Sequence, residues 1–293
     1  MRRTKRSQSG LKLLVTLFVV ALCSFAWAQS PKAWFFIQLT DPQFGMYASD
    51  AAFEQESANF EFAIATANRL KPAFVIVTGD LINKPGDASE GTEYLRIAAK
   101  LDSSIPLYNV PGNHDVGNVP TPGSIAKYTA RFGPDHYLFE SNGLVGIVLD
   151  SVLIHSPQEA TYLYAAQEEW LKEELERLKK RGARQIVVFQ HHPWFLESID
   201  EADAYENIPK ERRLRYLKLL SDYGVSHVFS GHCHRNKIAR FGALELVTTG
   251  PIGKPLGEGA DSGMRIVWIR NGQIEHRYYG MGNIPNVATA AVK

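Results

Sequence analysis

Short apolar runs of strand length recur along the chain, and most of them end in a polar cluster. Trp34–Leu39 and Phe74–Val77 are the first two, and similar runs cover residues 105–110, 144–149, 185–190 and 227–230. They are nearly continuous in apolar residues, which is typical of strands buried on both faces. We therefore expect these segments to form sheets that helices cover.

Segments with apolar residues at helical spacing lie between the predicted strands. The clearest cover residues 53–70, 90–101, 167–181 and 209–223. Gly182 and Gly224 follow the last two, at the position where glycine commonly ends a helix. From Ile238 to about Tyr279 the pattern changes to short strands with glycine turns. The alternation of strands and helices predicts an α/β fold.

The polar clusters that follow the strands carry metal-ligand chemistry. Ligands in α/β folds gather beyond the carboxyl ends of strands, so these clusters are candidates for one shared site. Carboxylate, amide and imidazole groups suit first-row ions such as Mn, Fe or Zn. The candidate residues, in chain order, are Asp41, Gln43, Asp80, Asn113, His114, His191, His192, His232 and His234.

The spacing within two clusters supports this interpretation. In Asp41-x-Gln43 and His232-x-His234, the paired side chains lie on the same side of an extended backbone. Even if only seven of these nine candidates bind metal, they are too many for one ordinary metal centre. With one bridging carboxylate they suffice for two ions about 3.5–4 Å apart, an arrangement that suits phosphoryl transfer.

The order of these motifs resembles that of the calcineurin-like metallophosphoesterase superfamily. That order is Asp-x-His, Gly-Asp, Gly-Asn-His-Asp/Glu, His and Gly-His-x-His, and it covers nearly the whole chain after the first thirty residues. The chain is most similar to the subgroup of serine/threonine phosphatase type. The strings that carry the resemblance are TDPQFG (40–45), GNHDVGN (112–118), FQHHPWFLES (189–198) and SGHCHRN (230–236).

The resemblance implies a fold of two mixed β-sheets packed as a sandwich and flanked by helices. It also implies two metal ions, with a water between them as the nucleophile. Asp80 would bridge the ions. The other predicted ligands are Asp41, Gln43 and His234 for the first ion, and Asn113, His191 and His232 for the second.

Two further residues have catalytic roles by the same resemblance. His114 would approach the phosphate, either to protonate the leaving oxygen or to stabilise charge on the transferring group. Asp115 would keep the His114 imidazole in the right tautomer.

The chain departs from the usual pattern at two positions. Gln43 stands where most members have histidine, and a neutral amide oxygen is a weaker donor, so we expect the first ion to be weakly held. Asn83 stands where many members have aspartate three residues after the bridging one. There we expect an effect on ligand orientation.

Several residues have competing interpretations. His191 competes with His192 for one ligand position and is favoured, because it lies two residues before Pro193. Asp150 is expected to be a structural turn residue, and Cys233 a packed side chain rather than a thiolate ligand. Arg235 either contacts phosphate or forms a surface ion pair. The remaining histidines are expected to be ordinary surface or core residues: His136, His155, His227 and His276.

An acidic stretch between residues 197 and 206 is expected to be a solvated loop. If it borders the mouth of the site instead, its charge disfavours polyanionic substrates by repulsion.

The first 28 residues resemble a secretory signal peptide. Basic residues precede an apolar stretch at 13–22, which is too short for a membrane span, and Ala26-Trp27-Ala28 resembles a cleavage site. We therefore expect a phosphoesterase domain over 29–283, a tail over 284–293, no stable membrane anchor, and a periplasmic or secreted bacterial protein.

Removal of the signal peptide changes the charge balance. It takes away five of 32 basic residues and none of 31 acidic ones, so the net charge falls from +1 to −4. Nucleic-acid binding is not indicated. Cys233 would then be alone, so no internal disulfide is expected.

The leading hypothesis is an exported dinuclear-metal phosphatase for phosphate monoesters, whose substrate is a small ester or a phosphoprotein. One alternative is a phosphodiesterase for cyclic nucleotides or glycerophosphodiesters. An alternative of another class is a non-catalytic binding module on the same fold. The presence of His114 argues against that module, because degenerate members tend to lose this residue.

Overall fold

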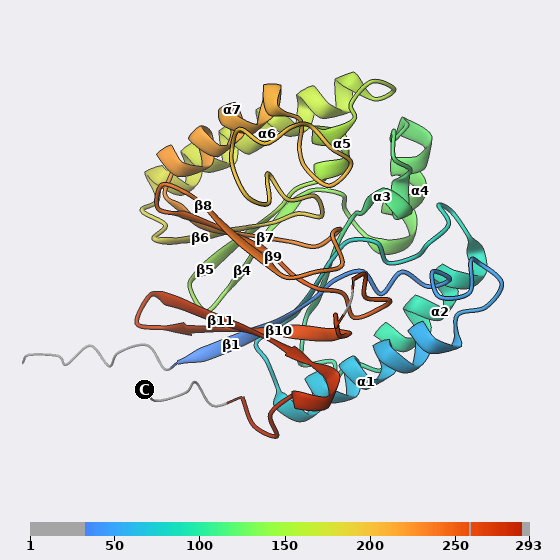
Figure 1. Ribbon diagram of the computed structural model, residues 1–293. Coiled ribbons are helices and arrows are strands. Elements are labelled where there is room, and N and C mark those ends of the chain that lie inside the picture. The colour runs from blue at the N-terminus through green and yellow to red at the C-terminus, as the bar shows by residue number, and fades with distance from the viewer. Residues whose placement is uncertain (1–32, 258, 289–293) are drawn as a thin grey trace, which may run out of the picture. The chain divides into compact units, whose positions relative to one another are not determined.

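The computed structural model describes residues 33–257 and 259–288, which form two stacked β-sheets with helices on both outer faces (Figure 1). The first sheet has the strand order β11 (Gln273–Gly280), β10 (Gly263–Arg270), β1 (Trp34–Leu39), β2 (Val75–Thr78) and β3 (Leu107–Val110). The second has the order β4 (Tyr137–Ser141), β5 (Leu144–Val148), β6 (Gln185–Phe189), β7 (Val225–Ser230), β9 (Leu244–Thr248) and β8 (Lys237–Phe241).

Both sheets are mixed, as the predicted fold class requires. Strands β1, β2 and β3 are parallel, and β10 and β11 add antiparallel pairs on the other side of β1. In the second sheet β5, β6, β7 and β9 are parallel, and the edge strands β4 and β8 are antiparallel to their neighbours. The prediction of an α/β sandwich flanked by helices is confirmed.

Aromatic side chains fill the space between the two sheets. Phe36 and Phe74 of the first sheet stack with ring centroids 4.6 Å apart. Phe189 and Phe229 of the second sheet each meet Phe36 edge-on at 5.7 Å. All four are fully buried, so the apolar runs of the sequence form the interior of the sandwich.

Helices cover the outer faces. In Figure 1, α1 (Glu54–Leu70) and α2 (Ala88–Ala98) lie beside the first sheet, and α6 (Thr161–Lys180) and α7 (Lys210–Asp222) lie against the second. Three of the four predicted helices begin within two residues of their observed starts. The fourth, α6, begins at Thr161, six residues before the predicted start, because the apolar stripe used for the prediction begins only at Leu171.

Shorter helices follow several strand ends: α3 (Asn113–Val116), α4 (Pro122–Phe132), α5 (Ser151–His155) and the 3-10 turn η1 (Met281–Asn283). The sequence pattern did not indicate α4, whose buried side chains are only Ile125 and Tyr128. Within residues 33–257 and 259–288, no helix has the length and apolar character needed to cross a membrane. The predicted signal peptide lies outside the described residues.

The first part of the predicted tail packs against the domain. Arg69 Nη1 donates hydrogen bonds to the carbonyls of Pro285 and Asn286, at 3.1 and 2.6 Å, and Trp268 Nε1 donates to the carbonyl of Ala288 at 3.2 Å.

Buried polar contacts join the sheets where their parallel strands end. Gln38 Nε2 donates to the Ser230 carbonyl at 3.1 Å, and Gln38 Oε1 accepts from Thr249 Oγ1 at 2.8 Å. The Asp41 amide donates to the Gly79 carbonyl at 3.1 Å. The carboxyl ends of β1, β2, β6 and β7 therefore converge at one end of the sandwich.

Candidate metal centre

All seven predicted ligands lie at these strand ends. Asp41 and Gln43 follow β1, Asp80 follows β2, and Asn113 begins α3 directly after β3. The three histidines come from the second sheet: His191 follows β6, and His232 and His234 follow β7. None of the seven residues is more than 6% exposed. So many buried polar side chains in one place need hydrogen-bond partners or a bound ion.

The backbone at these positions is unusual. Five of the seven residues have left-handed φ angles between 41° and 70°, namely Asp41, Gln43, Asp80, His232 and His234. Residues other than glycine rarely have φ angles in this range, and strained residues of this kind cluster at functional sites. The expected extended backbone within Asp41-x-Gln43 and His232-x-His234 is therefore wrong, because the fold holds all four residues in left-handed conformations.

Two glycines of the motifs allow the close approach of neighbouring loops. A Cβ atom at Gly112 would lie 2.2 Å from the Asp80 amide nitrogen, and one at Gly231 would lie 1.8 Å from Thr40 Oγ1. Any larger residue at either position would push the ligand loops apart.

The ligand atoms meet in two groups that share Asp80. His191 Nε2 lies 3.1 Å from Asn113 Oδ1, 3.3 Å from Asp80 Oδ2 and 3.2 Å from His232 Nδ1. His234 Nε2 lies 3.5 Å from Asp41 Oδ1. Asp80, His191 and His232 place ligand atoms within 4.8 Å of one another, and so do Asp41, Asp80 and His234.

Main-chain carbonyls fix the orientation of all three imidazoles. His191 Nδ1 donates to the Thr78 carbonyl at 2.9 Å, His234 Nδ1 to the Lys254 carbonyl at 2.5 Å, and His232 Nε2 to the Tyr205 carbonyl at 2.9 Å. A carbonyl only accepts, so each of these outer nitrogens carries the hydrogen. When the rings are neutral, the inner nitrogens of His191 and His234 present lone pairs to carboxylate and amide oxygens, which are also acceptors, and that of His232 faces His191 Nε2. A cation among them removes this mismatch.

Gln43 adds an independent sign of a cation. Its Nε2 donates to Asn83 Oδ1 at 3.0 Å, which orients the amide group. Its Oε1 is buried, and among the described residues it has no hydrogen-bond partner. An orphaned acceptor beside these carboxylates and imidazoles fits a metal ligand, so the residues present are suited to metal ions.

The pKa shifts of His191 and Asp80 also indicate that positive charge is favoured in this site. Burial alone lowers the pKa of His191, but the carboxylates of Asp80 and Asp41 outweigh it and raise that pKa to about 9. Burial disfavours the charged form of Asp80, yet the neighbouring imidazoles, His191 first, lower its pKa below the ordinary value. A proton on His191 thus offsets the negative charge here when no cation does, and a metal ion competes for the same lone pair.

His114 lies beside the predicted ligands, and its ring is held by an unexpected partner. The His114 amide donates to Asp80 Oδ1 at 2.9 Å, and its Nδ1 donates to the Asn83 carbonyl at 2.7 Å. The Nε2 atom is therefore the one available for chemistry on a substrate.

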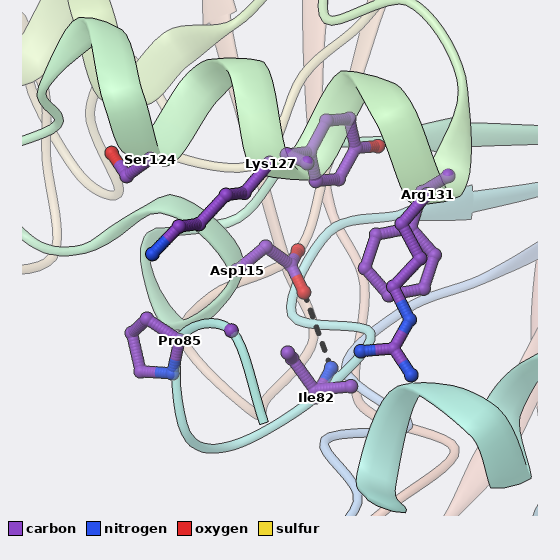
Figure 2. Close-up of a pocket in the computed structure, with 9 residues that line it drawn as sticks. Ile82, Pro85, Asp115, Ser124, Lys127 and Arg131 are labelled. Atoms are coloured by element: carbon purple, nitrogen blue, oxygen red, sulfur yellow. Dashed lines mark hydrogen bonds between the residues drawn. The ribbon is translucent and has the colours of Figure 1, made fainter. Parts of the chain in front are cut away.

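The expectation that Asp115 orients His114 is wrong. The Asp115 carboxylate instead accepts from the main-chain amides of Leu81, Ile82 and Gly112, at 2.9, 3.2 and 2.7 Å. Figure 2 shows this carboxylate directed at Ile82. Asp115 also lines a cavity of about 180 Å³ between α4 and the loop after β2. It joins the loops after β2 and β3, since carboxylates satisfy several amides at once.

Other competing interpretations can now be compared with the geometry. His191, not His192, lies beside Asp80, whereas His192 Nδ1 faces Ser151 Oγ at 3.3 Å. Asp150 caps α5 by accepting from the Val152 and Leu153 amides, which confirms a structural role. Cys233 is buried, and burial raises the pKa of its thiol to about 12, so it stays a packed thiol.

Sequence reasoning missed one residue that contacts this centre. Tyr205, in the acidic stretch, touches both Asn113 and His232. Hydrophobic periodicity does not predict contacts of loop residues. The sequence did offer one indication of Tyr205, an aromatic residue within a charged segment.

Another group of His and Glu side chains lies between β7, β9 and β11. Ligand atoms of His227, Glu245 and His276 also lie within 4.8 Å of one another. Arg265 Nη1 donates to His276 Nδ1 at 2.9 Å, so His276 Nε2 carries the hydrogen and donates to Glu245 Oε1 at 2.8 Å. Arg240 pairs with the other Glu245 oxygen. Donors and acceptors are matched here without a metal ion.

Comparison with known proteins agrees with the fold and the site. The model of the calcineurin-like phosphoesterase family matches residues 36–236, and the chain belongs to that family. It is a metal-dependent phosphoric ester hydrolase, and the alternative of a non-catalytic binding module is set aside.

Two relatives that are similar over most of the chain are named as phosphatases. The serine/threonine-protein phosphatase CPPED1 of Bos taurus is 36% identical over 265 residues, covering 85% of this chain and 84% of that protein. The protein of the same name from Homo sapiens is 35% identical over 266 residues, with the same coverage.

Solved structures support the fold. A dimetal phosphatase from Danio rerio has a TM-score of 0.59 at 13% identity and covers 84% of this chain and 99% of its own. The purple acid phosphatase PPD1 from yellow lupin has a TM-score of 0.62 at 13% identity and covers 85% and 52%.

Proposed function

We propose that this enzyme is an exported phosphatase that uses two metal ions to hydrolyse phosphate monoesters, including phosphoproteins. The observation that carries the two-ion proposal is the position of Asp80, whose carboxylate belongs to both groups of ligand atoms. Asp41, Gln43 and His234 would hold one ion, and Asn113, His191 and His232 the other. Such ions, when bound, lower the pKa of a water and offset charge on phosphoryl oxygens. The nitrogen and oxygen ligand set suits Mn, Fe or Zn.

The remaining chemistry belongs to His114. The Asn83 carbonyl keeps its Nδ1 protonated, and the bond from its amide to Asp80 fixes the ring beside the ligands. Its Nε2 is then the nitrogen that faces a substrate, and a doubly protonated ring can donate the Nε2 proton to the leaving oxygen of an ester. Asp115 acts only by holding together the loops that carry His114 and Asp80.

Monoesters are favoured over diesters by similarity to proteins named serine/threonine-protein phosphatases. The test is a substrate panel on freshly purified protein with added Mn, Fe or Zn. It compares p-nitrophenyl phosphate and a phosphoserine peptide with bis-p-nitrophenyl phosphate, a cyclic nucleotide and a glycerophosphodiester. Preferential monoester turnover with two ions per chain is the expected result. Preferential diester turnover would assign the alternative function, and one bound ion would refute the two-ion proposal.

Export rests on residues 1–28, outside the described part of the chain. The expected mature N-terminus is Gln29. N-terminal sequencing of protein from a periplasmic fraction tests this directly. Recovery in the cytoplasm with residues 1–28 intact would contradict it.

A further inference from the structure

The segment between β6 and α7 passes over the metal centre, and Tyr205 is its point of contact. The Tyr205 carbonyl accepts from His232 Nε2 at 2.9 Å, and its hydroxyl oxygen accepts from Asn113 Nδ2 at 2.8 Å. Its ring lies 4.7 Å from that of His232. Three separate groups of one residue thus touch two predicted ligands.

Most of residues 197–205 are exposed, as expected of a solvated loop, but the segment is also anchored to the domain. Arg213 of α7 is fully buried and donates to the carbonyls of Ile199, Glu201 and Ile208 at 2.7 to 3.1 Å. The Glu201 carboxylate accepts from Asn207 Nδ2 at 2.7 Å and from three main-chain amides at residues 196–198. The position of Tyr205 is therefore set before any substrate binds.

The Tyr205 hydroxyl retains an unused donor. Asn113 donates to its oxygen, so the hydroxyl hydrogen points to another partner. No acceptor for it is recorded in residues 33–257 and 259–288, and Tyr205 is 51% exposed. Tyr205 is therefore accessible to a substrate that approaches the metal centre.

We propose that Tyr205 donates this hydrogen bond to a phosphoryl oxygen of the substrate, a role that rests on the proposed phosphatase function. The same Asn113 amide that offers Oδ1 to the metal centre, 3.1 Å from His191 Nε2, holds the hydroxyl with its Nδ2. The Asn113 amide group thus contacts the Tyr205 hydroxyl through its nitrogen, while its oxygen is the predicted metal ligand. Phosphoryl oxygens are charged acceptors, and hydrogen bonds to charged groups are stronger than neutral ones.

The test compares Tyr205→Phe with Tyr162→Phe, a 64% exposed tyrosine of α6. Tyr205→Phe keeps the ring and the carbonyl and removes only the hydroxyl. We expect kcat/KM for p-nitrophenyl phosphate to fall about 10- to 100-fold, and inorganic phosphate to bind the Mn-loaded protein about 5- to 10-fold more weakly by calorimetry. Metal content should stay at the wild-type value, and Tyr162→Phe should match wild type in every measurement.

Two results would overturn the role of Tyr205. One is wild-type turnover and phosphate affinity in Tyr205→Phe with a loss in Tyr205→Ala, because only the packing of the ring on His232 would then matter. The other is loss of metal from Tyr205→Phe, because the hydroxyl would then serve Asn113 alone. Absence of ester turnover in wild type would refute the proposed function instead, and phosphate affinity would still decide the role of Tyr205.

Discussion

Two clusters of imidazole and carboxylate groups lie within residues 33–257 and 259–288, and their hydrogen-bonding patterns are opposite. In the metal centre, the outer nitrogens of His191, His232 and His234 donate to carbonyls, so the inner lone pairs face other acceptors. In the second cluster, Arg265 donates to the outer nitrogen of His276, and its inner nitrogen donates to Glu245. Residue type and proximity therefore do not define a metal site. The direction of the N–H groups does.

The clusters also differ in how they balance charge. Among the described residues, Asp80 and Asp41 have imidazoles as their recorded positive partners, whereas Glu245 pairs with Arg240 and, through His276, with Arg265. Burial, followed by the charge of Arg265, lowers the pKa of His276, which keeps that ring neutral. The second cluster is complete without a metal ion, and the first is not.

Neutralising one carboxylate in each cluster should produce the largest difference between the two clusters. Asp80→Asn removes the shared ligand, so metal content should fall and kcat should drop roughly 10³-fold, because electrostatic stabilisation worth several kcal/mol is lost. Elemental analysis and steady-state kinetics measure both effects.

Glu245→Gln is the matched control. Metal content and kcat should equal the wild-type values, while the free energy of unfolding should fall by about 1–3 kcal/mol, because Arg265 and Arg240 lose a charged partner. A metal ion lost from Glu245→Gln would show that the second cluster binds one, and the distinction drawn from N–H directions would be wrong.

A second prediction concerns an imidazole that adjoins the metal centre without belonging to it. His114→Ala should lower kcat about 10²- to 10³-fold and leave the metal content unchanged, because only Nε2 faces the chemistry. Comparable loss of metal and rate would instead make His114 part of the metal centre.

Asp115→Asn should reduce thermal stability more than kcat, since its carboxylate serves three main-chain amides.

The fold and the ligand loops were accessible from sequence for a physical reason. Buried strands need continuous apolar runs, and the polar residues that end them, such as Asp41 and Asp80, stand out against that background. The helix α4 was missed because a helix that buries two side chains leaves little periodic signal.

The contacts that orient the site were not accessible. His191, His232 and His234 are held by main-chain carbonyls, and any residue provides a carbonyl, so the sequence carries no sign of them. Tyr205 lies 92 positions from Asn113, and only the fold brings them together. The same limit explains the error on Asp115, whose expected contact with His114 came from the family resemblance and not from the fold of this chain.

A third prediction uses Asp150, a buried carboxylate without the imidazoles that surround Asp80. Burial raises its pKa to about 7, and Oδ2 has no recorded partner among the described residues. The folded protein thus retains a proton that the unfolded chain releases near pH 4, so this residue costs stability increasingly between pH 4 and 7. Asp150→Asn keeps the cap of α5 and should raise the free energy of unfolding by about 2–4 kcal/mol at pH 8, with little change at pH 4.

Urea unfolding of wild type and variant at each pH measures this difference. The control is Asp87→Asn, a cap of α2 whose carboxylate is exposed and whose pKa is lowered by bonds from Ser89 and Glu90. It should give no gain at pH 8. Equal stability of Asp150→Asn and wild type at pH 8 would mean that the burial of this carboxylate is relieved by solvent.

The smallest expected effect tests the one amide oxygen among the ligands of the first ion. Gln43→His replaces it with a stronger donor whose second ring nitrogen can still donate to Asn83 Oδ1, as Gln43 Nε2 does at 3.0 Å. We expect about tenfold tighter binding of the more weakly held ion in competition with a chelator. Asn83→Asp is not an equivalent change, because Asn83 Nδ2 donates to Asp50 and a second carboxylate there would face the first. Unchanged affinity in Gln43→His together with unchanged affinity in Gln43→Ala would remove Gln43 from the ligand set, and its buried Oε1 would then need another explanation.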